Sequence, residues 1–191
     1  MLTDLFKIGI WVVDITLDND SISDYCYKLK KDDETGRFIS NRGGWQSKEL
    51  QGEHPPLNPL FQAIVKHGND YARGIQLKTK PFEKIAGIWV NINGHKDYNL
   101  AHDHPGCAIS GVYYVKNSHI GGDIMFDSPY SALMNGYWWD YLENYNDYTS
   151  SQYRSESSTG KLIMFPSWLT HFVMPNKNKT EDRISISFNL K

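Results

Sequence analysis

The second half of the sequence is a succession of short segments with the pattern of β-strands. Seven such segments lie at residues 85–93, 100–104, 107–115, 121–126, 161–165, 170–174 and 183–190. Turn-forming residues separate most of these segments, and this spacing is typical of a β-sandwich or a β-barrel. The second half therefore predicts a mainly β fold, which leaves helices to the N-terminal part of the chain.

The N-terminal third predicts one strand and two helices. Residues 8–15 form a short apolar segment, and residues 18–30 and 57–73 carry apolar side chains at helical spacing. Asp18 or Asp20 can cap the first helix, because carboxylates accept hydrogen bonds from free N–H groups of the first turn. Between the helices, residues 40–48 predict an ordered loop. We expect the two helices to cover one outer face of the β-structure.

Length and composition favour one soluble domain over residues 1–191. The formal net charge is -2, which provides no general attraction to nucleic acid or to an anionic membrane. Cys26 and Cys107 are the only cysteines, so we expect a reducing, cytoplasmic location without a disulfide framework. No stretch is long and apolar enough to span a bilayer, and the start of the chain lacks a signal-peptide cleavage site. The oligomeric state has no signature in the sequence.

An aromatic-rich insertion separates two of the predicted strands, at about residues 127–159. Its aromatic residues are Tyr130, Tyr137, Trp138, Trp139, Tyr141, Tyr145, Tyr148 and Tyr153, interleaved with Asp140, Glu143, Asp147 and Glu156. Long loops in small domains are often lids or binding loops. The alternative is a small subdomain whose aromatic side chains pack onto the barrel, and the sequence favours neither interpretation.

A pair of histidines precedes the third of the seven predicted strands. In an extended backbone the side chains of His102 and His104 point to the same face. Neighbouring imidazoles suit iron, zinc or copper, although such pairs also occur on protein surfaces without a metal. His171 begins another predicted strand and is the candidate for a third ligand.

The last predicted strand alternates strictly between polar and apolar residues. Its polar positions are Arg183, Ser185, Ser187 and Asn189. This face either points to water, as in an ordinary half-exposed strand, or lies inside the barrel. In the second case the guanidinium of Arg183 and the hydroxyl of Ser185 are suited to holding a carboxylate.

The order of these motifs resembles the iron(II)/2-oxoglutarate-dependent oxygenases. The segments that carry the resemblance to one bacterial and bacteriophage branch of that superfamily are Ser40-Asn-Arg-Gly-Gly-Trp-Gln-Ser47, Trp89-Val-Asn91, His102-Asp-His-Pro-Gly106, Ser110-Gly-Val-Tyr-Tyr114, Phe165-Pro-Ser-Trp168 and Arg183-Ile-Ser-Ile-Ser-Phe-Asn189. The resemblance covers nearly the whole chain except the aromatic insertion. It implies a double-stranded β-helix, or jelly-roll, core with the metal in its open mouth.

By this resemblance His102 and His171 match the two histidine ligands of iron. Position 104 matches the place where most of the superfamily has Asp or Glu, and here it is His104. Three arrangements remain open: a site of three histidines, a bulge that turns Asp103 inward, or water as the third ligand. Strand alternation favours His104.

The resemblance also implies a site for the cosubstrate. Arg183 matches the residue that binds the C5 carboxylate of 2-oxoglutarate, and Ser185 matches its hydroxyl partner. Tyr114 and Asn91 are further candidates for this site, on the strands that contain Ser110 and Trp89.

The implied activity is hydroxylation of a protein side chain or a small molecule, with iron(II), 2-oxoglutarate and oxygen. Two alternatives are a three-histidine, cupin-like dioxygenase that does not use 2-oxoglutarate and a non-catalytic jelly-roll binding protein. The first alternative predicts metal-dependent activity without succinate release from 2-oxoglutarate. The second predicts no tight binding of metal.

Overall fold

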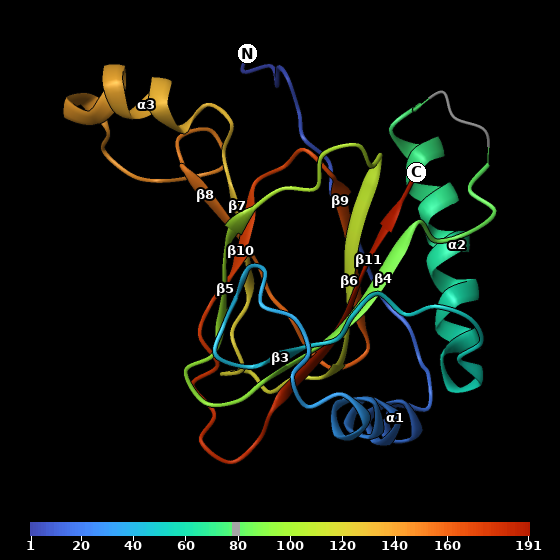
Figure 1. The fold of residues 1–191 in the computed structure, drawn as a ribbon. Helices are drawn as coiled ribbons and strands as arrows, with labels where there is room; N and C mark the ends of the chain where they lie inside the picture. The colour runs from blue at the N-terminus through green and yellow to red at the C-terminus, as the bar shows by residue number, and fades with distance from the viewer. Residues whose placement is uncertain (78–80) are drawn as a thin grey trace.

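Two antiparallel sheets face each other in the computed structural model, which describes residues 1–77 and 81–191 (Figure 1). The six-stranded sheet has the order β1 (Trp11–Asp14), β9 (Lys161–Pro166), β6 (Ile109–Lys116), β11 (Arg183–Leu190), β4 (Gly87–Asn93) and β3 (Trp45–Gln46). The five-stranded sheet has the order β2 (Asn41–Arg42), β5 (Tyr98–His102), β10 (His171–Val173), β7 (Ile124–Asp127) and β8 (Gln152–Ser155). From β4 to β7 and again from β9 to β11, successive strands alternate between the sheets. This arrangement confirms the predicted jelly-roll core.

Two N-terminal helices cover the outer face of the six-stranded sheet (Figure 1), as the sequence predicts. They are α1 (Asn19–Asp32) and α2 (Asn58–Gly74), the latter preceded by the 3-10 turn η1 (Pro55–Leu57). The carboxylate of Asp18 accepts a hydrogen bond from the backbone N–H of Ser21 at 3.1 Å and so caps α1. The buried side of α2 includes Leu60 and Ile64, both fully buried against the sheet.

Strand β11 separates the apolar core from the polar interior of the barrel. Its apolar side chains, Ile184, Ile186, Phe188 and Leu190, join the helices in one buried cluster. Its polar side chains point in the opposite direction, between the two sheets. Arg183 is 1% exposed and Ser185 is 6% exposed, so the polar face of this strand is inside the barrel and not in water.

The structure differs from the sequence prediction in the region of the aromatic insertion and at some strand ends. For example, β5 covers Tyr98–His102, whereas the predicted strand covers residues 100–104. The insertion contains α3 (Ser131–Trp138), the 3-10 turn η2 (Trp139–Tyr141) and the edge strand β8, none of which we predicted. β8 is polar and lacks the alternation of a half-buried strand, because it lies at the sheet edge and only pairs with β7. The loop at 40–48 contributes the two short strands β2 and β3.

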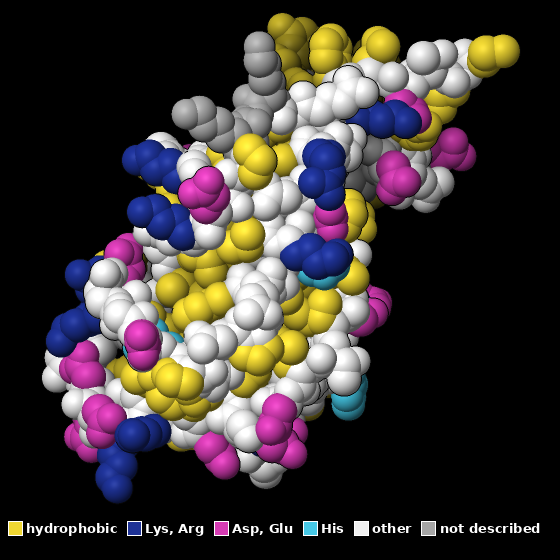
Figure 2. All heavy atoms as spheres, turned by 90° about the vertical axis from the view of Figure 1, so that its right-hand side faces the viewer, with side chains coloured by type: hydrophobic (Ala, Val, Ile, Leu, Met, Phe, Trp, Pro, Cys, Tyr) yellow, Lys and Arg dark blue, Asp and Glu magenta, His cyan; other side chains and the backbone are white. Residues whose placement is uncertain are grey.

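The surface has mixed charge. Figure 2 shows acidic and basic side chains interspersed with apolar ones over the side of the molecule that carries α1 and α2. Within residues 1–77 and 81–191, no helix has the length and hydrophobicity needed to cross a membrane.

Candidate active site

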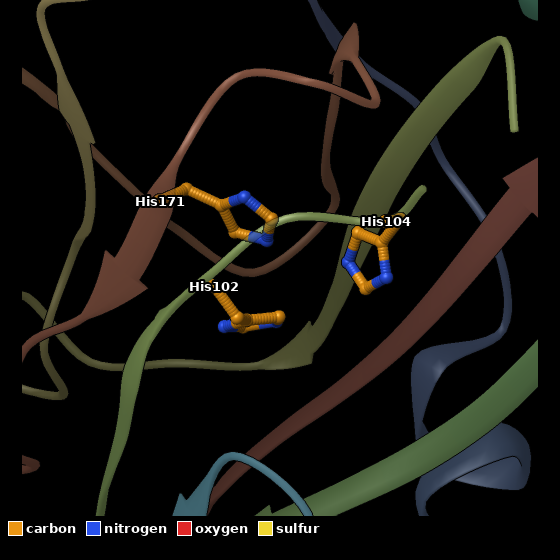
Figure 3. Close-up of side chains that lie close together, drawn as sticks. All are labelled: His102, His104 and His171. Carbon is orange, nitrogen blue, oxygen red and sulfur yellow. The ribbon is translucent and has the colours of Figure 1, made fainter. Parts of the chain in front are cut away.

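Three histidines from neighbouring elements meet at one end of the barrel. His102 is the last residue of β5 and is paired in register with His171, the first residue of β10. His104 follows β5 in the chain and turns its ring toward the other two (Figure 3). One ring nitrogen of each histidine lies within 4.8 Å of the others, a spacing that suits a shared metal ion.

Backbone hydrogen bonds orient two of these rings. Nδ1–H of His102 donates to the carbonyl of Leu100 at 2.7 Å, and Nδ1–H of His171 donates to that of Leu169 at 2.9 Å. A carbonyl oxygen only accepts, so each of these nitrogens carries the proton and Nε2 keeps its lone pair. Metal-binding histidines in proteins are commonly held in this way.

A backbone contact and an aromatic neighbour position the third ring. The N–H of His104 donates to the carbonyl of Ser167 at 2.9 Å, which ties the segment after β5 to the segment after β9. The ring of His104 lies 5.7 Å from that of Trp89, measured between centroids. His104 therefore reaches the cluster from outside the strand ladder, because β5 has already ended at His102.

Burial keeps all three imidazoles neutral at neutral pH. Desolvation, with repulsion from the neighbouring His102, lowers the pKa of His171 to about 3 and that of His104 to about 4. Desolvation also lowers the pKa of His102, against smaller opposing effects of its bond to Leu100 and of Asp103. Three neutral imidazoles with free lone pairs are a donor set that fits a divalent transition metal.

The carboxylate next to the cluster points elsewhere. Asp103 is exposed, whereas His102 and His104 on either side of it are partly buried and belong to the cluster. The pairing of β5 with β10 has a register irregularity between His171 and Val173, but it does not bring Asp103 into the cluster. The geometry thus favours three imidazoles over two imidazoles and a carboxylate.

One cavity joins the histidines to Arg183. The residues that line it come from both sheets: Ser40, Trp89, Asn91, Asn99, His102, His104, Gly111, Val112, Tyr114, Ile124, Phe165, His171, Val173, Arg183, Ser185 and Ser187. All seven site residues predicted from the sequence are in this lining. Histidines occupy the end where β5 finishes, and Arg183 lies at the start of β11.

The backbone holds part of the Arg183 guanidinium in place. Its Nη1 donates to the carbonyls of Gly121 at 2.6 Å and Met174 at 2.9 Å. Its Nη2 is buried, and no described residue provides it with a hydrogen-bond partner. Nη1 is thus already bound to the backbone, and Nη2 is free to bind a carboxylate.

Two more polar groups in the cavity have unused hydrogen-bonding capacity. The hydroxyl of Tyr114 and Oδ1 of Asn91 are buried without a partner among the residues that the structure describes. Nδ2 of Asn91 donates to Oγ of Ser187 at 3.1 Å. Tyr114 is paired in register with Ser185, so its hydroxyl lies on the strand next to the one that starts at Arg183. Each unpaired buried group costs about 1–3 kcal/mol, a cost that a polar ligand in the cavity would remove.

This distribution of polar groups fits a dicarboxylate that also reaches the metal. The free Nη2 of Arg183 and the hydroxyl of Tyr114 are donors for one carboxylate at the inner end. At the opposite end, the imidazole cluster offers neutral ligands to an ion that can bind the second carboxylate.

A comparison with protein-family models identifies the family. Residues 87–189, more than half of the chain, match the model described as "Putative 2OG-Fe(II) oxygenase". The chain belongs to the 2OG-Fe(II) oxygenase family. The predicted class of enzyme and the predicted use of iron(II) and 2-oxoglutarate are thereby confirmed. A search of curated proteins found no match to this oxygenase.

Solved structures share the fold of this oxygenase over almost its whole length. A Pseudomonas putida prolyl-4-hydroxylase has a TM-score of 0.65 at 15% identity, covering 96% of this chain and 92% of that one. A prolyl hydroxylase from Trichoplax adhaerens, in complex with a hypoxia inducible factor peptide fragment, has a TM-score of 0.64 at 15% identity, with 95% and 83% covered. The epimerase SnoN, in complex with Fe3+, alpha ketoglutarate and nogalamycin RO, has a TM-score of 0.62 at 13% identity, covering 96% of this chain and 78% of that one.

Sequence reasoning missed several neighbours of the site in this oxygenase. Phe165 and Phe126 enclose the ring of His171, with centroids at 4.5 and 6.3 Å, and were assigned only to strands. Ser187 shares the polar face of β11 with Arg183, and this alternation was the signal for a role at the cavity. The carbonyls of Gly121 and Met174 had no such signal, because every residue has a carbonyl.

Proposed function

We propose that this oxygenase hydroxylates a C–H bond of a polypeptide side chain at the three-histidine cluster. His102, His104 and His171 hold iron(II), and Arg183 holds the distal carboxylate of 2-oxoglutarate. The observation that carries this proposal is the single cavity that joins three neutral imidazoles to a buried arginine with an unpaired Nη2.

The bound iron, with 2-oxoglutarate and oxygen, supplies the oxidising power for attack on an unactivated C–H bond. The protein contributes position and exclusion of water. Nη2 of Arg183 and the hydroxyl of Tyr114, both without a partner among the described residues, would donate hydrogen bonds to the distal carboxylate, and Ser185 is paired with Tyr114 beside them. Phe126 and Phe165 shield His171, which keeps this side of the centre dry.

A three-histidine set changes the charge of the centre. Each imidazole is a neutral ligand, whereas a carboxylate in place of His104 would contribute a negative charge. Three imidazoles would therefore leave one more unit of positive charge on a bound metal, and this charge would attract the anionic end of the cosubstrate more strongly.

Paired variants of the two adjacent residues test the ligand set. We expect His104→Ala to weaken iron(II) binding by about tenfold or more, because it removes a ligand. We expect Asp103→Asn to leave the affinity nearly unchanged, because this carboxylate is exposed and outside the cluster. Anaerobic titration calorimetry measures both. A larger loss in Asp103→Asn than in His104→Ala would contradict the assignment.

A second pair of variants tests the cosubstrate site. Tyr114→Phe should raise the KM for 2-oxoglutarate by about two- to tenfold, because it removes one hydrogen bond. Tyr113→Phe is the matched control, since the hydroxyl of Tyr113 donates to Asn19 of α1 at 2.6 Å, on the other face of β6. An equal change of KM in both variants would assign the effect to β6 as a whole and not to the hydroxyl.

Similarity in fold to prolyl hydroxylases supports a polypeptide substrate and makes prolyl side chains the first to test. The direct test is release of succinate from 2-oxoglutarate by the protein with iron(II), ascorbate and oxygen. We expect succinate release that stops when iron is withheld. Metal-dependent oxygen consumption without any need for 2-oxoglutarate would instead support a three-histidine dioxygenase, a candidate that the histidine at position 104 favours.

A further inference from the structure

The aromatic insertion is attached to the barrel beside the histidine cluster. Phe126 on β7 is paired in register with His171, and the insertion begins immediately after β7. The N–H of Asp127 donates to the carbonyl of Thr170, and that of Ser128 to the carbonyl of Ser151, at 2.9 and 2.8 Å. Both ends of residues 128–151, here called the insertion surface, are therefore fixed next to the mouth of the cavity. Figure 1 shows α3 projecting from this end of β7 and β8.

The insertion surface exposes an unusual amount of aromatic side chain. Every residue of α3 is at least partly exposed, and Tyr137, Trp139 and Tyr141 are 76%, 66% and 85% exposed. An open hollow of about 510 Å³ is lined by Tyr137, Trp138, Tyr141, Leu142 and Thr149. The aromatic residues thus do not pack onto the barrel. Contiguous exposed apolar surface of this kind marks an interaction site, and Tyr and Trp carry much of the binding energy at such sites.

The charge of the insertion surface selects the kind of partner. It contains Asp140, Glu143 and Asp147, and the sequence has no lysine or arginine between residues 117 and 153. The faces of Tyr and Trp rings attract cations, with Arg and Lys as the usual protein partners. The aromatic faces and carboxylates of the insertion surface, in a segment without lysine or arginine, are complementary to lysine and arginine side chains. The same carboxylates would repel an acidic partner.

A segment near the start of this chain contacts the insertion surface through Asp4. The hydroxyl of Tyr148 donates to the carboxylate of Asp4 at 2.8 Å, and the ammonium of Lys7 lies 2.5 Å from the same carboxylate. The irregular residues near the start of the chain therefore pass beside Tyr148, and Lys7 pairs with Asp4 within that segment. This contact shows that polypeptide fits beside the insertion surface, whereas the preference for lysine and arginine rests on the charge of residues 128–151 alone.

We propose that the insertion surface binds an extended polypeptide segment rich in lysine and arginine, and so presents a neighbouring residue to the histidine cluster. This inference rests on the proposed function and names the substrate class of the same site. A polypeptide fits because the hollow and the cavity with the histidine cluster are separate and share no lining residue. One ligand must therefore extend well beyond the cavity to contact both the hollow and the metal centre.

Binding of synthetic peptides to the metal-free protein, residues 1–191, tests the proposal. Basic, neutral and acidic peptides of equal length and equal apolar content are titrated while tryptophan fluorescence and heat are recorded. We expect the basic peptide to bind at least about tenfold more tightly than the neutral one, and the acidic peptide not to bind. Added salt should weaken the basic complex.

A charge-neutral variant provides the matched comparison. Asp140→Asn, Glu143→Gln and Asp147→Asn together should reduce binding of the basic peptide by about tenfold. The same kind of change at Asp20, Asp24 and Asp32 on α1 should leave it unchanged. Equal affinity for all three peptides, or equal loss in both variants, would overturn the proposal. Concentration-dependent dimerisation that the insertion variant abolishes would assign the surface to a second copy of the chain.

The metal-free measurement separates this inference from the proposed function. If the protein prefers the basic peptide but releases no succinate when loaded with iron and 2-oxoglutarate, the docking surface is supported and the oxygenase activity is rejected. Succinate release without any preference for basic peptides would retain the activity and reject the docking surface.

Discussion

Replacement of Arg183 by glutamine is expected to raise the KM for 2-oxoglutarate by about two to three orders of magnitude. The variant removes a charged partner from a carboxylate in a buried site, a loss that typically costs 2–5 kcal/mol at about 1.4 kcal/mol per tenfold. Nη2 is the arm free to make that contact, while Nη1 is bound to the backbone. Initial rates of succinate release at varied 2-oxoglutarate measure the effect.

The two carbonyls that Nη1 contacts make a stability control necessary. Arg183→Gln also leaves the carbonyls of Gly121 and Met174 with fewer donors, which lowers the free energy of unfolding. Arg183→Lys keeps a positive charge and donor hydrogens without the guanidinium fork, so we expect an intermediate KM. Urea unfolding identifies variants that are folded under assay conditions. A folded Arg183→Gln protein with the original KM would exclude this arginine from the cosubstrate site.

Removal of the most buried histidine is the second change with a large expected effect. His171→Ala should weaken iron(II) binding by about a hundredfold or more and abolish turnover, because it removes a ligand and the ring that Phe165 packs against. Its Nε2 has no substitute among the described residues of the cluster. Anaerobic calorimetry with iron(II) measures the affinity, and circular dichroism checks that the barrel is intact.

An exposed histidine serves as the matched control for this variant. His119 is exposed and outside the cluster, so His119→Ala should bind iron(II) as the original protein does. If His171→Ala retained full affinity while folded, the metal would have to bind elsewhere. If both variants lost affinity equally, surface binding and not a defined centre would explain the titration.

The strand pattern was sufficient to predict a β-sandwich or β-barrel, and the jelly-roll topology was implied only by the family resemblance. Ile184, Ile186 and Phe188 mark the face of β11 toward the helices, and the polar face followed from the same period. The helices were predictable from apolar spacing and from Asp18 as a cap. β8 was missed because an edge strand buries too little to leave a periodic pattern.

The sequence singled out seven residues that line one cavity, but not the geometry that brings them together. Alternation places His104 beside His102 only if the strand continues, yet β5 ends at His102. His104 reaches the cluster through its backbone bond to Ser167, a contact between segments more than sixty residues apart in the chain. Only Nη2 of Arg183 is free, because Nη1 binds two backbone carbonyls. The positions of these carbonyls depend on the tertiary structure and leave no pattern in the sequence.

We propose that three imidazoles and one arginine together hold iron(II) and 2-oxoglutarate. An anaerobic crystal structure of the protein with both bound is the most direct test of this proposal. We predict nitrogen atoms of His102, His104 and His171 as the protein ligands, with the distal carboxylate of 2-oxoglutarate at Nη2 of Arg183 and the hydroxyl of Tyr114. An oxygen of Asp103 on the metal, or a cosubstrate carboxylate bound away from Arg183, would contradict it.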